Sequence, residues 1–169
     1  MKKIFLLLSV IGTLTFTSCN NDDDVYVDTD TIGETIQLNN TNLTFDVNTG
    51  RYQLLYPLNP NIFDSDAVLV YRFTNDDGFT VKQLIPRTLY LGGGDEVDYD
   101  FNYTSTDVLI YADATFDLST APEFINNQTF QIVILPSNFS SDIDVNDYDA
   151  VMSALNENGG NKVRVVETR

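Results

Sequence analysis

The feature that most constrains the fold is a repeated alternation of apolar and polar residues at strand length. Residues 97–103 place Val, Tyr, Phe and Tyr on one side and Asp, Asp and Asn on the other, and residues 52–58 repeat the pattern with Tyr, Leu, Tyr and Leu. Successive side chains of a strand point to opposite faces, so each segment predicts one buried and one solvated face. Residues 67–73 are instead apolar on both sides, which predicts a central strand covered on both faces.

Further strands are expected from Thr35 onward and at 80–85, 107–112, 129–135 and 162–166. Asp77-Gly78, just before one of them, supplies the positive φ angles that a tight hairpin turn requires. Short strands that recur every ~8–12 residues with turn residues between them are typical of a sandwich. The sequence therefore predicts one all-β domain over residues 34–169, an antiparallel β-sandwich of immunoglobulin-like or jelly-roll-like type. Its core is expected to hold the apolar strand residues Val68, Leu69, Val70, Phe101, Ile110, Phe130, Ile132 and Ile134.

One segment near the C-terminus has helical spacing. Its apolar residues are Tyr148, Val151, Met152 and Leu155. Asn146 or Asp147 can act as N-cap, and Gly159-Gly160 can end the helix. We expect one short helix at 147–156 on an otherwise all-β domain.

The N-terminus has the layout of a secretory signal. Two lysines are followed by an apolar run over residues 4–11 and by small or hydroxylated residues up to Ser18. The apolar run is much shorter than the ~20 residues that span a bilayer. Cys19, the only cysteine, then resembles the cysteine of a bacterial lipobox, whose thiol is diacylated and which becomes the mature N-terminus. This predicts a lipoprotein signal peptide over 1–18 and a membrane anchor at Cys19.

Residues 19–33 are rich in Asn, Asp and Thr, which predicts an acidic flexible tether. Asp22, Asp23 and Asp24 resemble the export signal that sends lipoproteins of Bacteroidota to the outer face of the outer membrane. The alternative is a linker that is merely acidic. The residues around Thr31 resemble the three-residue O-glycosylation motif of the same phylum. Together these resemblances predict an outer-membrane location facing the cell exterior, with a periplasm-facing location left open.

The charge balance limits the partners. The chain carries 9 Lys and Arg against 25 Asp and Glu, a net charge of −16, and loss of Lys2 and Lys3 with the signal would bring it to −18. Such a surface repels phosphate backbones, which excludes nucleic acid as a partner. A protein or a glycan remains as a partner beyond the membrane.

Residue types that carry common chemistries are absent. The chain has no histidine, and its one cysteine is assigned to the lipid, which removes His-dependent triads and thiol nucleophiles. Gly92-Gly93-Gly94 precedes Asp95 and Glu96, whose charges repel phosphate, so it predicts a hairpin loop. Asp98 and Asp100 share a face but alternate with the core residues, so we expect them to be solvated. The sequence predicts a protein that is not an enzyme and has no cofactor.

Asp142, Asp144 and Asn146 imitate the start of a calcium-binding EF-hand loop. The pattern then fails, because Asp147 stands where the loop needs Gly and Ser153 where it needs a bidentate carboxylate. Acidic residues also stabilise the start of a helix. We favour helix capping, with these three residues as the only candidate metal ligands.

Four segments are similar to a group of small flavobacterial lipoproteins to which no activity is assigned. They are Thr106 to Tyr111, Pro122 to Phe124, Asn127 to Phe130 and Tyr148 to Leu155. The likeness covers most of residues 19–156. It implies a shared fold and carries no catalytic residue.

The leading functional hypothesis is a lipid-anchored, surface-exposed, non-catalytic envelope lipoprotein that acts through binding. One alternative is a glycan-binding accessory lipoprotein, which needs aromatic residues on an exposed face. Because Tyr52, Tyr56, Tyr71, Tyr99 and Tyr103 are assigned to the core, the sequence favours this alternative less. The third hypothesis is a carboxylate-based hydrolase, which needs two acids in a concave pocket with at least one of them desolvated.

Overall fold

A computed structural model describes residues 33–139, 142–157 and 161–167. The strands are β1 (Gly33–Thr41), β2 (Thr44–Asp46), β3 (Arg51–Pro57), β4 (Ala67–Asp76), β5 (Phe79–Ile85), β6 (Arg87–Gly92), β7 (Asp95–Tyr103), β8 (Asp107–Ala114), β9 (Gln128–Leu135) and β10 (Asn161–Glu167). Two short 3-10 turns, η2 (Leu118–Thr120) and η3 (Pro122–Phe124), link β8 to β9, and one helix, α1 (Tyr148–Glu157), precedes β10.

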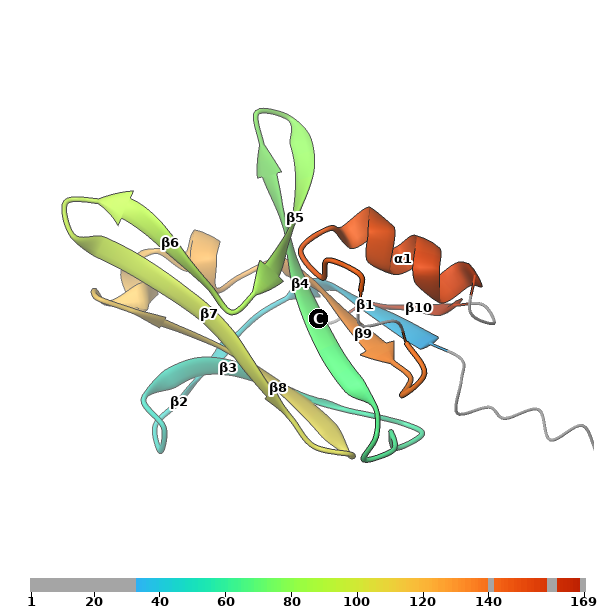
Figure 1. The fold of residues 1–169 in the computed structure, drawn as a ribbon. Helices are drawn as coiled ribbons and strands as arrows, with labels where there is room; N and C mark the ends of the chain where they lie inside the picture. Colours follow the sequence, from blue (N-terminus) through green and yellow to red (C-terminus); the bar gives the residue numbers. More distant parts are fainter. Residues whose placement is uncertain (1–32, 140–141, 158–160, 168–169) are drawn as a thin grey trace, which may run out of the picture.

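The strands form two sheets of five (Figure 1). The first sheet has the order β10-β1-β9-β4-β5, and the second has the order β2-β3-β8-β7-β6. All neighbouring strands are antiparallel except β1 and β10, which run parallel from Gly33 opposite Asn161 to Asn39 opposite Glu167. The predicted all-β sandwich with a short C-terminal helix is confirmed, with this one parallel pair as an addition that the sequence did not indicate.

The hairpin turns follow from local sequence. Between β4 and β5, Asp77 and Gly78 have φ angles of 48° and 87°, and the Asn75 side chain accepts a hydrogen bond from the Gly78 amide. This is the turn predicted from Asp-Gly, because both central residues need positive φ. Between β6 and β7, Gly92, Gly93 and Gly94 also have positive φ, which confirms the predicted hairpin loop.

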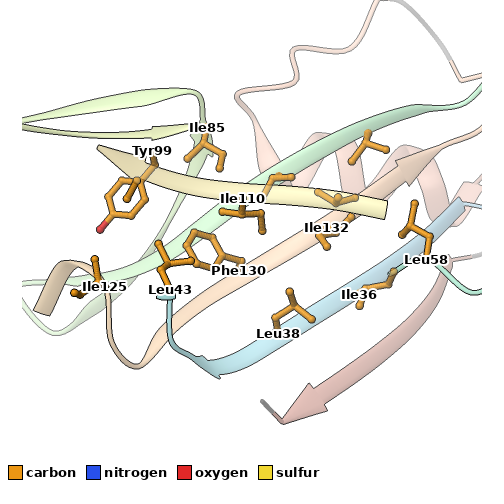
Figure 2. Packing of buried hydrophobic residues seen from close by; sticks show 14 of the residues in the cluster. Ile36, Leu38, Leu43, Leu58, Ile85, Tyr99, Ile110, Ile125, Phe130 and Ile132 are labelled. Carbon is orange, nitrogen blue, oxygen red and sulfur yellow. The ribbon is translucent and has the colours of Figure 1, made fainter. Parts of the chain in front are cut away.

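The main core lies between the two sheets. Of the residues predicted for it, six are buried: Val68, Val70, Ile110, Phe130, Ile132 and Ile134. Figure 2 shows Phe130 and Ile132 of the first sheet in this core together with Ile110 of the second. Phe101 is only half-buried against it. Leu69 is also half-buried, and it lies on the opposite face of the first sheet, because it alternates with Val68 and Val70 along β4.

Helix α1 covers the outer face of the first sheet (Figure 1). It buries Val151, Ala154 and Leu155, and Leu155 packs directly over Gly33 of β1. The Tyr148 ring packs edge-on against Tyr71 and Phe73 of β4, with ring centres 5.1 and 5.9 Å apart. The molecule is therefore three layers deep at the first sheet. This confirms that β4 is covered on both faces and that a helix lies close to the predicted 147–156.

The interior also holds a charged residue, Arg72, which lies in the strand predicted to be apolar on both faces. Arg72 is 7% exposed and points between the sheets, with its guanidinium 4.4 Å from the ring centre of Tyr99. Its Nε donates to Gln128 Oε1 at 2.9 Å, and burial lowers the pKa of Arg72. The Tyr99 hydroxyl donates to the Phe124 carbonyl at 2.6 Å, and burial raises the pKa of Tyr99 to about 12.

The tyrosines assigned to the core divide into three groups. Tyr71 and Tyr99 are fully buried, Tyr52 and Tyr56 are half-buried, and Tyr103 is 44% exposed. The assignment of Tyr103 is wrong because this residue ends β7, where the alternation continues after the facing sheet has stopped covering it.

We predict that Ile110→Ala lowers the free energy of unfolding by ~2–5 kcal/mol, because Ile110 is fully buried and the truncation leaves a cavity. Leu55→Ala is the matched control on the neighbouring strand β3, since Leu55 is 60% exposed, and should cost less than ~0.5 kcal/mol. Urea unfolding of both variants measures this. Equal losses would contradict the placement of the core.

Candidate functional site

The predicted N-terminal sites lie outside the described residues. This holds for the lipidation site Cys19, for the export-signal residues Asp22, Asp23 and Asp24, and for the glycosylation candidate Thr31. Within the described residues, the candidate sites are the acidic segment before α1 and two surface pockets.

The acidic segment before α1 is held together by its own hydrogen bonds. Asp144 Oδ1 accepts from the backbone amide and the side-chain amide of Asn146, at 2.9 and 3.0 Å. These bonds lower the pKa of Asp144. Asp147 Oδ1 accepts from the Ala150 amide at 3.0 Å, so Asp147 is the N-cap, which confirms the capping role of one of the two expected residues.

The candidate metal ligands are not gathered into a ligand set. Across residues 33–139, 142–157 and 161–167, the structure brings together no group of three or more His, Cys, Asp or Glu side chains able to hold a metal ion. Asp144 Oδ1 accepts from the side-chain nitrogen of Asn146, and Asp142 makes contacts of its own.

Asp98 and Asp100 lie on the outer face of the second sheet, as the alternation predicts. Asp98 is exposed and accepts a hydrogen bond from Thr88. Asp100 is half-buried and accepts from the Tyr111 hydroxyl at 2.9 Å, so it is not simply solvated. Arg51 lies on the same face, 4.6 Å from the ring centre of Tyr111.

A pocket of about 210 Å³ lies where the β2–β3 hairpin meets the end of β8 and the start of η2. We call it the aromatic–acidic pocket, after its three aromatic residues, Phe45, Tyr52 and Phe116, and the acid Asp117. Small residues fill the spaces between them, including Gly50, Ala112 and Ala114.

Local sequence builds each wall of this pocket. In the β2–β3 hairpin, Asp46 accepts a hydrogen bond from the Asn48 amide, and Gly50 takes a φ of +72° that an L side chain rarely adopts. The short hairpin sets Phe45 opposite Tyr52, with ring centres 5.3 Å apart and planes tilted by 56°.

On the other wall, Asp117 caps η2, because its Oδ1 accepts from the Ser119 amide at 2.9 Å. The hydrogen bonding to Ser119 lowers the pKa of Asp117, which keeps the carboxylate ionised. Asp113 Oδ2 pairs with Arg51 Nε at 2.9 Å. The Asp113 carboxylate lies on the outer face of the second sheet, because Asp113 pairs with Asp98 and alternates with the buried Ala112. Asp117 accepts hydrogen bonds from the backbone and the side chain of Ser119, and the Tyr52 hydroxyl makes no hydrogen bond to a described residue. The pocket thus combines aromatic rings, the tyrosine hydroxyl and one carboxylate, that of Asp117.

A second pocket, of about 240 Å³, lies between the end of β9 and the segment that leads to α1. Leu135, Phe139 and Ile143 are among its lining residues, and none of the lining side chains is charged. It has few groups with which to orient a ligand.

The carboxylates do not resemble those of a hydrolase. Asp46, Asp117 and Asp144 are the described acids whose pKa is shifted, and each is lowered by hydrogen bonds. A general acid needs the opposite shift, which comes from burial in an apolar environment.

The exposed aromatic residues are scattered. Phe45, Phe63, Phe79, Tyr90 and Tyr103 are each at least 44% exposed, and they lie on five different segments. No two of these five are cross-strand partners. They do not form the row of rings that a sugar chain would follow.

Comparisons with known proteins add no relative. No protein-family model matches the chain, and neither a curated protein nor a solved structure matches it. Of the helices within the described ranges, none has the length and apolar character needed to cross a membrane.

The pocket was not predicted from the sequence. Asn48-Thr49-Gly50 between two strand-like segments is a turn signal from which the pairing of Phe45 with Tyr52 could have been found. That this hairpin would meet Phe116 and Asp117 depends on how the second sheet continues into η2, which no local pattern encodes.

We predict that Asp147→Ala lowers the free energy of unfolding by ~0.5–2 kcal/mol, because it removes the bond to the Ala150 amide. Asp147→Asn should be nearly neutral, since Asn caps as well as Asp does. Thermal or urea unfolding measures both.

The same unfolding experiment tests the metal alternative. Capping predicts that neither EDTA nor millimolar calcium changes the melting temperature. A calcium site would add stability that grows with ligand concentration. A calcium-dependent rise that Asp144→Asn abolishes would contradict the capping account.

Proposed function

We propose that this protein is a lipid-anchored, non-catalytic lipoprotein of the cell envelope that acts by binding a partner at the outer surface of the outer membrane. The observation that carries the proposal is the position of Cys19. It directly follows a segment with two lysines, an apolar run and small residues, and Asp22, Asp23 and Asp24 come shortly after it. The lipidated cysteine would be the mature N-terminus, and residues 20–32 would tether the domain to the membrane.

The energetics of acylation support a lasting anchor. Each buried CH₂ of an acyl chain contributes ~0.8 kcal/mol, so a single chain holds a protein marginally while two or more hold it stably. A diacylated cysteine falls in the second class. The net charge of −16 argues against additional adhesion through anionic lipid headgroups, which attract basic segments.

The described domain supports a binding role more than a catalytic one. Where the pKa of a described carboxyl group is shifted, it is lowered. The aromatic–acidic pocket offers ring surfaces and acceptor oxygens, and its acid is not one with the raised pKa that a general acid needs. Such a pocket orients a ligand by contact and charge.

We predict that Cys19→Ala moves the protein from the membrane fraction to the soluble fraction or leaves the signal uncleaved. Replacing Asp22, Asp23 and Asp24 together with Ala should keep the protein in membranes but protect it from protease added to intact cells. The measurement is fractionation and protease shaving, followed by immunoblotting.

Two matched variants control this experiment. Ser18→Ala keeps a small residue before the cysteine and should leave anchoring unchanged. Asp28→Ala with Asp30→Ala removes acids from the same tether, away from the cysteine, and should leave surface display unchanged. Cys19→Ala protein that sediments with membranes as wild type does would refute the lipid anchor. Equal shaving of all the tether variants would refute the export role of the three aspartates.

A further inference from the structure

Strand β10 forms one edge of the first sheet. It pairs with β1 on one side, and no strand within the described ranges lies on its other side. An edge of this kind presents backbone N–H and C=O groups that can pair with a further strand. The pairing with β1 continues over all seven residues without a register shift, and β10 contains no proline. The backbone of β10 is therefore available to an added strand over its full length.

The outer face of β10 is apolar and exposed. Val163 and Val165 alternate with Val166, which packs against the main core, so these two valines lie on the outer face of the first sheet. Their side chains are 61% and 57% exposed. A strand added to this edge would cover them if it placed apolar residues at the matching positions.

The inner face of β10 is basic. Arg164 pairs with Glu34 of β1 at 3.1 Å. Lys162 lies two residues before Arg164, on the same face, and is exposed. No ion pair joins Lys162 to another residue in the described part of the chain. A carboxylate directly opposite Lys162 on an added strand would complete this face, because opposite charges stabilise a cross-strand pair.

The residues shortly before β1 have the complementary pattern. We propose that residues 24–28 of the same chain, Asp-Val-Tyr-Val-Asp, add to the free edge of β10 as an antiparallel strand. A shift by one residue would turn the aspartates toward the exposed valines of β10. The register that matches both faces pairs Val25 with Val165, Val27 with Val163 and Asp28 with Lys162.

The length of the chain fits this register. β1 begins at Gly33, opposite Asn161 at the start of β10. The added strand would lie two strand spacings from β1, about 10 Å. The five steps from Asp28 to Gly33 can span up to ~17 Å, so residues 29–32 can pass the start of β10 and enter β1. If Asp30 were opposite Lys162 instead, three steps of ~10 Å in total would leave no length for the turn.

Charge and connectivity favour this segment over one from another molecule. Residues 19–32 contain five Asp and no Lys or Arg, whereas the net charge of −16 makes most of the chain repel an acidic segment. The covalent link to β1 also holds residues 24–28 close to the edge at high effective concentration. A separate chain would lose translational and rotational freedom on binding.

The pairing would have two consequences for the molecule. It would cover an edge that could otherwise join the sheet of another protein. It would also leave only residues 19–23 between the domain and the proposed lipid anchor. The inference does not rest on that anchor, since residues 24–28 are equally close to β1 whether or not Cys19 is acylated. The two proposals therefore fail separately.

The first test is hydrogen exchange of the ¹⁵N-labelled full-length protein in a mild non-ionic detergent. Val25→Asp with Val27→Asp should speed exchange about tenfold or more at the β10 amides that point away from β1, because the added strand is lost. Thr29→Asp with Thr31→Asp adds the same charge to the connection and should leave these amides unchanged. The amide of Ile132 in β9 should stay protected in both variants, which shows that the domain remains folded.

A charge exchange tests the register. Lys162→Glu should speed exchange of the same amides about twofold to fivefold, because it places two acids opposite each other. Lys162→Glu with Asp28→Lys should restore the slow exchange. Failure of the second change to restore it would overturn this register.

A disulfide tests which chain supplies the strand. In a Cys19→Ala background, Val25→Cys with Val165→Cys should oxidise to a bond within one chain, because opposite residues of antiparallel strands have Cα atoms ~4.5–5.5 Å apart. Val25→Cys with Leu55→Cys, at an exposed position of the second sheet, should not. A bond between two chains would assign the edge to a second copy and overturn pairing within the chain. Equal exchange in all the tether variants, or equal oxidation with Leu55→Cys, would overturn the added strand itself.

Discussion

The burial of the first sheet on both faces is the constraint on which the rest of the structure depends. All of β9 except Thr129 is buried, with Phe130, Ile132 and Ile134 facing the second sheet and Val133 and Leu135 facing α1. Each such side chain contributes ~1.5–3 kcal/mol when fully removed from water. The hydrogen bonds of β9 to β1 and β4 are shielded by the same packing, which fixes the register of both neighbours.

Among the residues that the structure describes, the second sheet is covered on one face only, and its chemistry follows from that. Its inner residues, such as Val97 and Ile110, complete the core, while its outer residues carry charge. Where its strands end, the facing sheet no longer covers the inner side chains. Tyr103 is exposed at one such end, and Tyr52 lines a pocket at another. The stable sheet thus holds the domain together, and the margin of the other sheet presents groups able to contact a partner.

The strands, the Asp77-Gly78 turn and the helix could be predicted because each is encoded by residues close together in the chain. The parallel pairing of β10 with β1 could not, since it joins the two ends of the domain. In the sequence, Arg72 is one polar residue within an apolar strand. Only the structure shows how its charge is accommodated inside, by the ring of Tyr99 on the facing sheet and by Gln128 on the neighbouring strand β9. The aromatic–acidic pocket was missed for the same reason, because its walls come from β2, β3, β8 and the turn after β8.

Native-state hydrogen exchange with increasing denaturant tests most directly whether the doubly covered sheet holds the fold together. The account predicts that the amides of Ile132 and Val133 exchange only through global unfolding, with the free energy and denaturant dependence of the whole domain. The amides of the short edge strand β2 should exchange through local opening at lower free energy. Exchange of Ile132 and Val133 by local opening, while β8 of the second sheet stays protected, would contradict the account.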